Sequence, residues 1–126
     1  MGQYLIDSNV ISSYFSGLFT EKGMIFIANI IDRIPNISVI THIESLSWIS
    51  DKGKEAVVEE FIGDSNVLPL STDIVKECIK IRRSRKIKTP DAIIAATAII
   101  HNLTLITNDS DFNNVQGLKI LNPNDL

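Results

Sequence analysis

Short apolar runs alternate with longer segments of helical periodicity along the sequence, and this alternation constrains the fold more than any other feature. The apolar runs predict strands at QYLID (3–7), ISVI (37–40), NVLPL (66–70), LTLIT (103–107) and LKIL (118–121). The helical segments are NVISSYFSG (9–17), TEKGMIFIANIIDRI (20–34), THIESLSWIS (41–50), KEAVVEEFI (54–62), STDIVKECIKIRRSRK (71–86) and TPDAIIAATAII (89–100). Strands separated by helices join in parallel through crossovers, and strands this apolar are covered on both faces. We therefore predict a three-layer α/β/α sandwich with a central, mainly parallel sheet.

The length and composition suit one such domain over residues 1–126. The hydrophobic content of 44% and the charged content of 21% are those of a globular protein with a sizeable core. The single cysteine, Cys78, excludes an internal disulfide and is expected to be a small buried side chain, as suits a reducing cytoplasm. No apolar run reaches the roughly 18 residues of a membrane span, and no secretory signal is recognisable, so we expect a cytoplasmic protein. The last residues, NPNDL (122–126), are expected to form a tail.

Acidic residues recur where the predicted strands end or the following helices begin. Asp7 ends the first strand, and Glu44 lies in the first turn of the helix after the second. Asp91 opens the helix that leads into the fourth strand, and Asp109 and Asp111 follow that strand directly. The carboxyl ends of parallel strands meet at one edge of a sheet, so these five side chains are expected to face the same rim.

Each of these acids also has a purely structural interpretation. Asp7 could cap the first helix, and Glu44 could form a capping box with Thr41. Asp91 could serve the helix dipole, and the two acids after the fourth strand could be turn residues. Four or five such coincidences on one rim need a common cause, and clustered carboxylates repel one another unless a cation is bound. Because the ligands are hard oxygens, with no His or Cys at ligand spacing, we expect Mg²⁺ or Mn²⁺.

An acidic site of this kind typically acts on phosphate. One or two divalent ions can hold a phosphodiester, activate a water and stabilise the leaving oxygen. The sequence contains neither a G-x-x-x-x-G-K-[ST] loop nor a G-x-G-x-x-G fingerprint. Nucleotide hydrolysis by a P-loop and hydride transfer on a Rossmann fold therefore find no support.

Four blocks of the sequence resemble the motifs of PIN-domain ribonucleases, most closely the VapC-type toxins of toxin–antitoxin pairs. The blocks are YLIDSNVI, ISVITHIESL, TPDAIIAATAI and LITNDSDF, in the order of the family and spanning Tyr4 to Phe112. The resemblance implies a PIN-like nuclease domain and a Mg²⁺- or Mn²⁺-dependent endoribonuclease. By position, the three core acids of the family fall on Asp7, Glu44 and Asp91, and the more variable fourth acid falls on Asp109.

The resemblance extends to supporting residues and to partners. Asn9 and Thr107 match polar positions that support the site, and Asp111 matches a position that is often structural. The family also implies a homodimer and a small antitoxin protein that covers the site with an extended segment. A non-toxin RNA-processing nuclease and a non-catalytic PIN-like module that binds RNA or protein remain alternatives.

A basic strip lies immediately before Asp91. The net charge of −3 argues against a broad surface for duplex nucleic acid, but it leaves room for a local strip. The cations of this strip are candidates to hold the RNA backbone; they are Arg82, Arg83, Arg85, Lys86 and Lys88. The alternative is a solvated helix end, where cations also suit the dipole.

Two further enzyme classes can be weighed against the same residues. A haloacid-dehalogenase-like phosphatase also has a first strand that ends in Asp, but it needs a second Asp where this chain has Asn9. A receiver domain needs a Lys after a late strand, and LITND offers none. Both classes therefore fit less well than the nuclease.

Overall fold

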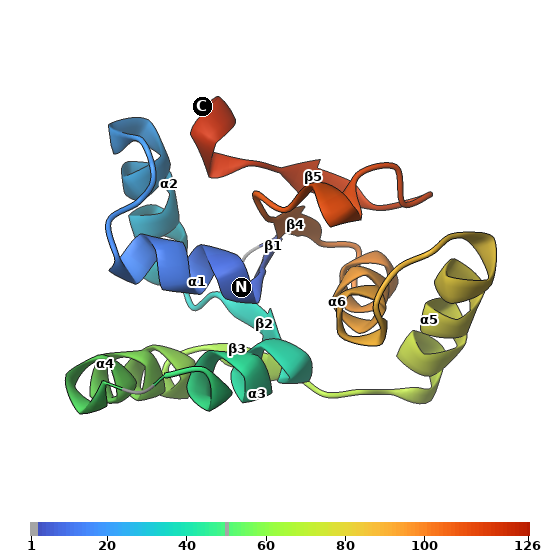
Figure 1. The fold of residues 1–126 in the computed structure, drawn as a ribbon, viewed down its shortest axis with the longest axis horizontal. Helices are drawn as coiled ribbons and strands as arrows, with labels where there is room; N and C mark the ends of the chain where they lie inside the picture. Colours follow the sequence, from blue (N-terminus) through green and yellow to red (C-terminus); the bar gives the residue numbers. More distant parts are fainter. Residues whose placement is uncertain (1–2, 50) are drawn as a thin grey trace.

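Parallel strands form one sheet at the centre of the computed structural model, which describes residues 3–49 and 51–126 (Figure 1). Within these residues the sheet has five strands in the order β3-β2-β1-β4-β5, and each neighbouring pair is parallel. The strands are β1 (Tyr4–Ile6), β2 (Asn36–Ser38), β3 (Asn66–Leu68), β4 (Thr104–Ile106) and β5 (Lys119–Leu121). The predicted parallel sheet is thus confirmed.

Helices cover both faces of this sheet, with α5 and α6 on one side and α1, α2 and α4 on the other (Figure 1). The helices are α1 (Ser8–Phe15), α2 (Glu21–Ile31), α3 (Val39–Ser47), α4 (Lys52–Gly63), α5 (Thr72–Ser84) and α6 (Thr89–Ile100). Two short 3-10 helices follow, η1 (Ser110–Phe112) and η2 (Pro123–Asp125). No helix in the described ranges is both long and apolar enough to cross a membrane.

Successive residues of the central strands serve opposite faces of the sheet, as the period of a strand requires. Leu5 and Leu105 belong to the core under α5 and α6, which also contains the buried thiol of Cys78. Ile6 and Ile106 belong to the core under α1, α2 and α4. The three-layer α/β/α sandwich is therefore confirmed, and it explains why the strands are so apolar.

The strand order fixes where a functional site can lie. From β1 the chain moves outward to β2 and β3, and then returns to the other side of β1 to form β4 and β5. The direction of winding therefore reverses beside β1 and β4, which pair in register through Ile6 and Ile106. Ligands bind outside the carboxyl ends of strands at such a reversal.

The second strand is shorter than predicted, because its last two predicted residues are helical. Helix α3 begins at Val39, and the hydroxyl of Ser38 accepts a hydrogen bond of 3.0 Å from the backbone N–H of Ile40. The predicted capping box between Thr41 and Glu44 is therefore wrong. The helix ends at Ser47, and the last residue of the predicted 41–50 segment lies outside the described residues.

Helix α6 spans the predicted residues 89–100. Its N-cap is Lys88, which makes no side-chain capping bond. Pro90 nevertheless lies within the first two helical positions, where a missing N–H costs nothing.

The chain ends against α2 instead of forming the predicted tail. Pro123 is buried in η2, and Asn124 Oδ1 accepts a hydrogen bond of 3.3 Å from the backbone N–H of Thr20. A Cβ added to Gly23 would lie 2.7 Å from the carbonyl oxygen of Pro123. Only a residue without a side chain allows this close approach of the C-terminal segment to α2.

Replacing Gly23 with Ala is expected to destabilise the protein. Ala normally favours a helix over Gly by about 1 kcal/mol, but the clash with a backbone oxygen costs about 1–3 kcal/mol, so the net effect is a loss. Thermal unfolding measures it as a lower midpoint. Gly63→Ala is the control, because nothing lies within 4 Å of a Cβ at that position. A Gly23→Ala protein that is more stable than Gly63→Ala would contradict the close contact.

Candidate active site

Asp7 lies at the carboxyl end of β1, and both of its carboxylate oxygens accept hydrogen bonds. Oδ1 accepts from the backbone N–H of Ser8 at 2.8 Å, which makes Asp7 the N-cap of α1. Oδ2 accepts from the hydroxyl of Thr107 at 2.9 Å, across the pairing of β1 with β4. Only 3% of Asp7 is exposed. The capping interpretation of Asp7 is therefore correct, and it places a carboxylate in the crevice as well.

The environment of Asp7 favours its neutral form. Burial raises the pKa of Asp7 to about 7, against the lowering effect of the hydrogen bonds from Thr107 and Ser8. The negative charges of Asp91 and Asp109 contribute to this raised pKa. These two carboxylates are therefore close enough to Asp7 to act on its charge.

Glu44 reaches the same crevice from α3. Its Oε1 accepts a hydrogen bond of 2.8 Å from the hydroxyl of Ser8, which also lies 3.2 Å from the hydroxyl oxygen of Thr41. Ser8 and Thr41 are buried, and α1 packs against α3. A positioning role for Ser8 and Thr41 was not predicted from sequence. The spacing of Thr41 and Glu44, three residues apart on one helix face, is the signal that could have indicated it.

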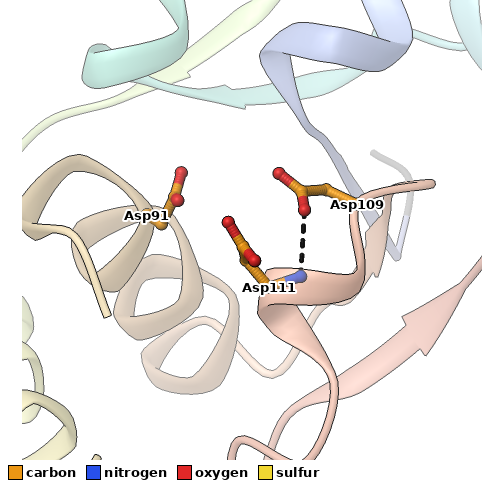
Figure 2. A group of neighbouring side chains, drawn as sticks. All are labelled: Asp91, Asp109 and Asp111. Carbon is orange, nitrogen blue, oxygen red and sulfur yellow. Dashed lines mark hydrogen bonds between the residues drawn. The ribbon is translucent and has the colours of Figure 1, made fainter. Parts of the chain in front are cut away.

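Asp91, Asp109 and Asp111 direct their carboxylates toward a common space (Figure 2). One oxygen from each of the three lies within 4.8 Å of the others. Asp109 Oδ1 accepts a hydrogen bond of 2.9 Å from the backbone N–H of Asp111, which shapes the turn at η1. The backbone N–H of Asp109 in turn donates to the hydroxyl of Thr107 at 3.1 Å. The turn interpretation of Asp109 is thus correct, and the same turn gathers carboxylates.

The charge on Asp91 links this trio to Glu44. Burial raises the pKa of Asp91, and the negative charge of Asp109 adds to the rise. Glu44 and Asp111 raise the pKa further, whereas the ammonium group of Lys88 lowers it. The structure therefore places all five predicted acids close enough to interact electrostatically, beside β1 and β4 where the direction of winding reverses.

The family model for the PIN domain matches residues 4–118 of this sequence. The chain belongs to the PIN-domain family. The family resemblance carried by the four sequence blocks is thereby confirmed. No curated protein of matching sequence was found.

Solved structures similar to this PIN domain include complexes of toxin–antitoxin systems. A toxin–antitoxin complex from Klebsiella pneumoniae contains a chain 29% identical to it, with a TM-score of 0.74, covering 95% of this chain and 97% of that one. FitAcB from Neisseria gonorrhoeae has 25% identity and a TM-score of 0.80, covering 98% and 99%. DNA-bound VapBC from Salmonella typhimurium, at 24% identity and a TM-score of 0.79 with coverage of 98% and 99%, shares the fold.

The donor set of this PIN domain fits a divalent cation. Three carboxylates within 4.8 Å of one another repel, and both burial and this repulsion raise the pKa of Asp91. Carboxylate oxygens are the ligands that Mg²⁺ and Mn²⁺ prefer. Asn9 is exposed on α1 and lines a hollow of about 460 Å³ together with Asn108 and Asp109. The site is therefore open to a polar ligand on that side.

The residues of the basic strip differ in exposure and in their contacts: Arg85 is half-buried, and the other four are exposed. Arg85 is half-buried, and its guanidinium donates to the carbonyl oxygens of Asn113 at 2.5 Å and Asp111 at 3.2 Å. Arg82 is exposed, and its Nε–H donates to the carbonyl oxygen of Ile87 at 3.2 Å. The exposed side chains that line a hollow of about 360 Å³ next to Asp111 are Arg82, Lys86 and Lys88. Arg83 is exposed as well but does not line this hollow.

Proposed function

We propose that this PIN domain is a metal-dependent endoribonuclease and the toxin of a type II toxin–antitoxin pair. The observation that carries the proposal is the convergence of five acids on the crevice beside β1 and β4, where the pKa values of Asp7 and Asp91 are raised. A structural acid could sit at any helix end, but buried carboxylates that face one another are stabilised in their ionised form by a bound cation. PIN-family membership and the toxin–antitoxin neighbours support the same activity.

The acids divide by environment into two groups of proposed ligands. Asp91, Asp109 and Asp111 can share one Mg²⁺ or Mn²⁺, since their oxygens lie within 4.8 Å. Asp7 and Glu44 complete the site directly or through water, and a bound ion neutralises phosphate charge and lowers the pKa of the attacking water. The residues of this chain then hold the ligands in place: Thr107 fixes Asp7, and Ser8 fixes Glu44. Protons are shared among the coupled carboxylates, so no single one is assigned as the base.

RNA would approach along the basic hollow. Arg82, Lys86 and Lys88 line it beside Asp111, so they can hold phosphates that flank the scissile bond, with Asn9 on the opposite side of the acids. Arg83 is exposed and can add a more distant contact. Phosphate contacts supply position and salt-dependent affinity but no base specificity.

A small antitoxin, homodimerisation and a cytoplasmic location complete the proposal. The antitoxin is supported by the complexes that contain similar chains, above all the one from Klebsiella pneumoniae. A free Cys78 suits the reducing compartment where RNA is cleaved. Sedimentation of the protein alone tests the homodimer, and co-purification with the product of a neighbouring small gene tests the antitoxin.

The activity is tested by incubating labelled RNA with the protein in Mg²⁺, in Mn²⁺ and in EDTA. Cleavage with either metal and none in EDTA is expected. Cleavage that persists in EDTA would contradict the metal mechanism. Binding of RNA without cleavage under every metal would instead favour a non-catalytic RNA-binding module. Cleavage by a protein whose gene has no small neighbouring gene for an antitoxin would favour an RNA-processing nuclease.

Substituting Lys86 and Lys88 with Ala is expected to weaken RNA binding much more than it lowers kcat for cleavage of bound RNA. Each lost phosphate contact lowers the slope of log affinity against log salt by about 0.7 for single-stranded RNA. The measurement is RNA affinity over a range of salt concentrations, together with kcat at saturating RNA. Lys22→Ala, an exposed lysine of α2, is the control. An unchanged salt slope in the double variant would exclude these lysines as backbone contacts.

A further inference from the structure

We propose that Arg85 is a positioning residue that holds Asp111 within reach of the cation shared with Asp91 and Asp109. The inference rests on the proposed metal site and assigns Arg85 a role different from RNA binding. Its basis is the direction of the guanidinium group, which donates hydrogen bonds to the turn that carries Asp111 while Arg85 also lines the basic hollow.

Arg85 connects two parts of the chain that lie far apart in sequence. It is the C-cap of α5, and its own backbone N–H donates to the carbonyl oxygen of Ile81 at 3.2 Å. Its Nη1 and Nη2 groups donate to the backbone carbonyls of Asn113 and Asp111 respectively. The two acceptors lie in and after η1, so Arg85 fixes that short helix from the outside.

The opposite side of η1 is fixed by other contacts. Asp109 Oδ1 accepts from the backbone N–H of Asp111, and the side chain of Phe112 is fully buried. Helix α6, which carries Asp91, also packs against η1. Arg85 therefore joins α5 to a turn that these contacts join to α6 and to the core, and in the proposed role it helps to set the separation of Asp111 from Asp91.

The geometry needs an arginine. Arg85 Nε is buried and has no hydrogen-bond partner among the described residues, so the two Nη groups alone make the connection. A planar guanidinium can serve two carbonyls at once, whereas the single ammonium of Lys cannot reproduce that fork. A residue that holds a metal ligand in place strengthens metal binding. Its loss typically lowers metal affinity 10- to 100-fold.

The test is the affinity of the apo-protein for Mn²⁺. It is measured from the electron paramagnetic resonance signal of free Mn²⁺ and by calorimetry. Arg85→Met and Arg85→Lys are expected to weaken Mn²⁺ binding about tenfold and to raise the Mn²⁺ concentration for half-maximal cleavage by the same factor. The kcat at saturating Mn²⁺ should stay within about threefold, because the same ligands assemble once the ion is bound. Arg33→Met, at an exposed arginine that follows α2 and lies outside the basic strip, should change none of these values.

A double variant identifies the route of the effect. In an Asp111→Asn background, Arg85→Met should weaken Mn²⁺ binding by less than about twofold, because the residue through which it acts has gone. An equal loss in both backgrounds, or wild-type Mn²⁺ affinity in folded Arg85→Met and Arg85→Lys, would overturn the role. A raised KM for RNA at unchanged Mn²⁺ affinity would show that Arg85 contacts RNA and does not position a metal ligand. A wild-type protein that binds no Mn²⁺ would overturn the metal site itself. Loss of Mn²⁺ binding in Asp91→Asn tests that site independently of Arg85.

Discussion

Asp91→Asn is expected to abolish RNA cleavage while leaving the protein folded. Asp91 is half-buried beside Asp109, Glu44 and Asp111, so its loss removes a ligand from the centre of the acidic cluster. A bound ion contributes several kcal/mol to stabilisation of the transition state, and about 4 kcal/mol corresponds to a thousandfold lower kcat. The same change should remove the stabilisation by Mn²⁺ that thermal unfolding detects in the wild-type protein.

Without a bound metal, Asp91→Asn is not expected to lower the stability of the protein. Because burial and the neighbouring carboxylates raise the pKa of Asp91, its ionised form is disfavoured in the folded state. Replacing the charge with an amide relieves that repulsion, and this gain offsets the roughly 0.3–1 kcal/mol that an acid contributes at a helix N-terminus. The unfolding midpoint without metal is therefore expected to stay level or rise, while the activity disappears.

The matched control is Asp73→Asn, which changes an exposed acid in the first turn of α5. It has the same relation to a helix dipole as Asp91, but it lies outside the acidic cluster. We expect a small loss of stability and unchanged cleavage. Wild-type cleavage by a folded Asp91→Asn protein would show that Asp91 serves only the helix.

The position of the acids followed from the sequence because each one is adjacent to an element that the sequence specifies strongly. Asp7 and Asp109 follow apolar runs that form largely buried strands, and Asp91 lies in the first turn of a helix whose start the sequence predicts. Parallel strands then bring their carboxyl ends together without further information. The convergence of the site thus depends on topology, which the hydrophobic pattern encodes.

The residues that hold the acids in place could not be predicted in the same way. The bond from Ser8 to Glu44 depends on how α1 packs against α3, and the bond from Arg85 to the carbonyl oxygen of Asp111 depends on where η1 lies relative to the end of α5. A basic residue at a helix end has the same sequence context whether it points to solvent or to a carbonyl. The start of α3 at Val39 was missed for a related reason, because the apolar residues after Ser38 suit a strand and a buried helix face equally.

The stability of the apo-protein is expected to fall as the pH rises from about 4 to about 7. Burial raises the pKa of Asp7 to about 7 in the folded state, from an ordinary value of 3.8. Between these values the folded protein binds more protons than the unfolded chain, so a rise in pH favours unfolding. The contribution of Asp7 is complete below about pH 4 and is lost once the pH exceeds about 7, with a magnitude on the order of 1–4 kcal/mol.

A bound cation should reverse this dependence. Carboxylates must lose their protons to bind a metal, so stabilisation by Mn²⁺ is expected to grow as the pH approaches 7. The measurement is the free energy of unfolding in urea at several pH values, with EDTA and with Mn²⁺. Asp7→Asn should flatten the dependence in EDTA, because the amide is neutral at every pH and its Oδ1 can still accept from the backbone N–H of Ser8.

Asp51→Asn separates the capping role of Asp7 from its buried charge. Asp51 is the N-cap of α4 and accepts from the backbone N–H of Gly53 at 2.8 Å, but it is exposed. Its replacement should lower stability by about 1 kcal/mol or less and keep the slope between pH 4 and pH 7. If the apo-protein instead gained stability over that range, Asp7 would be ionised in the folded state. Burial and the neighbouring carboxylates would then not keep Asp7 neutral in the apo-protein.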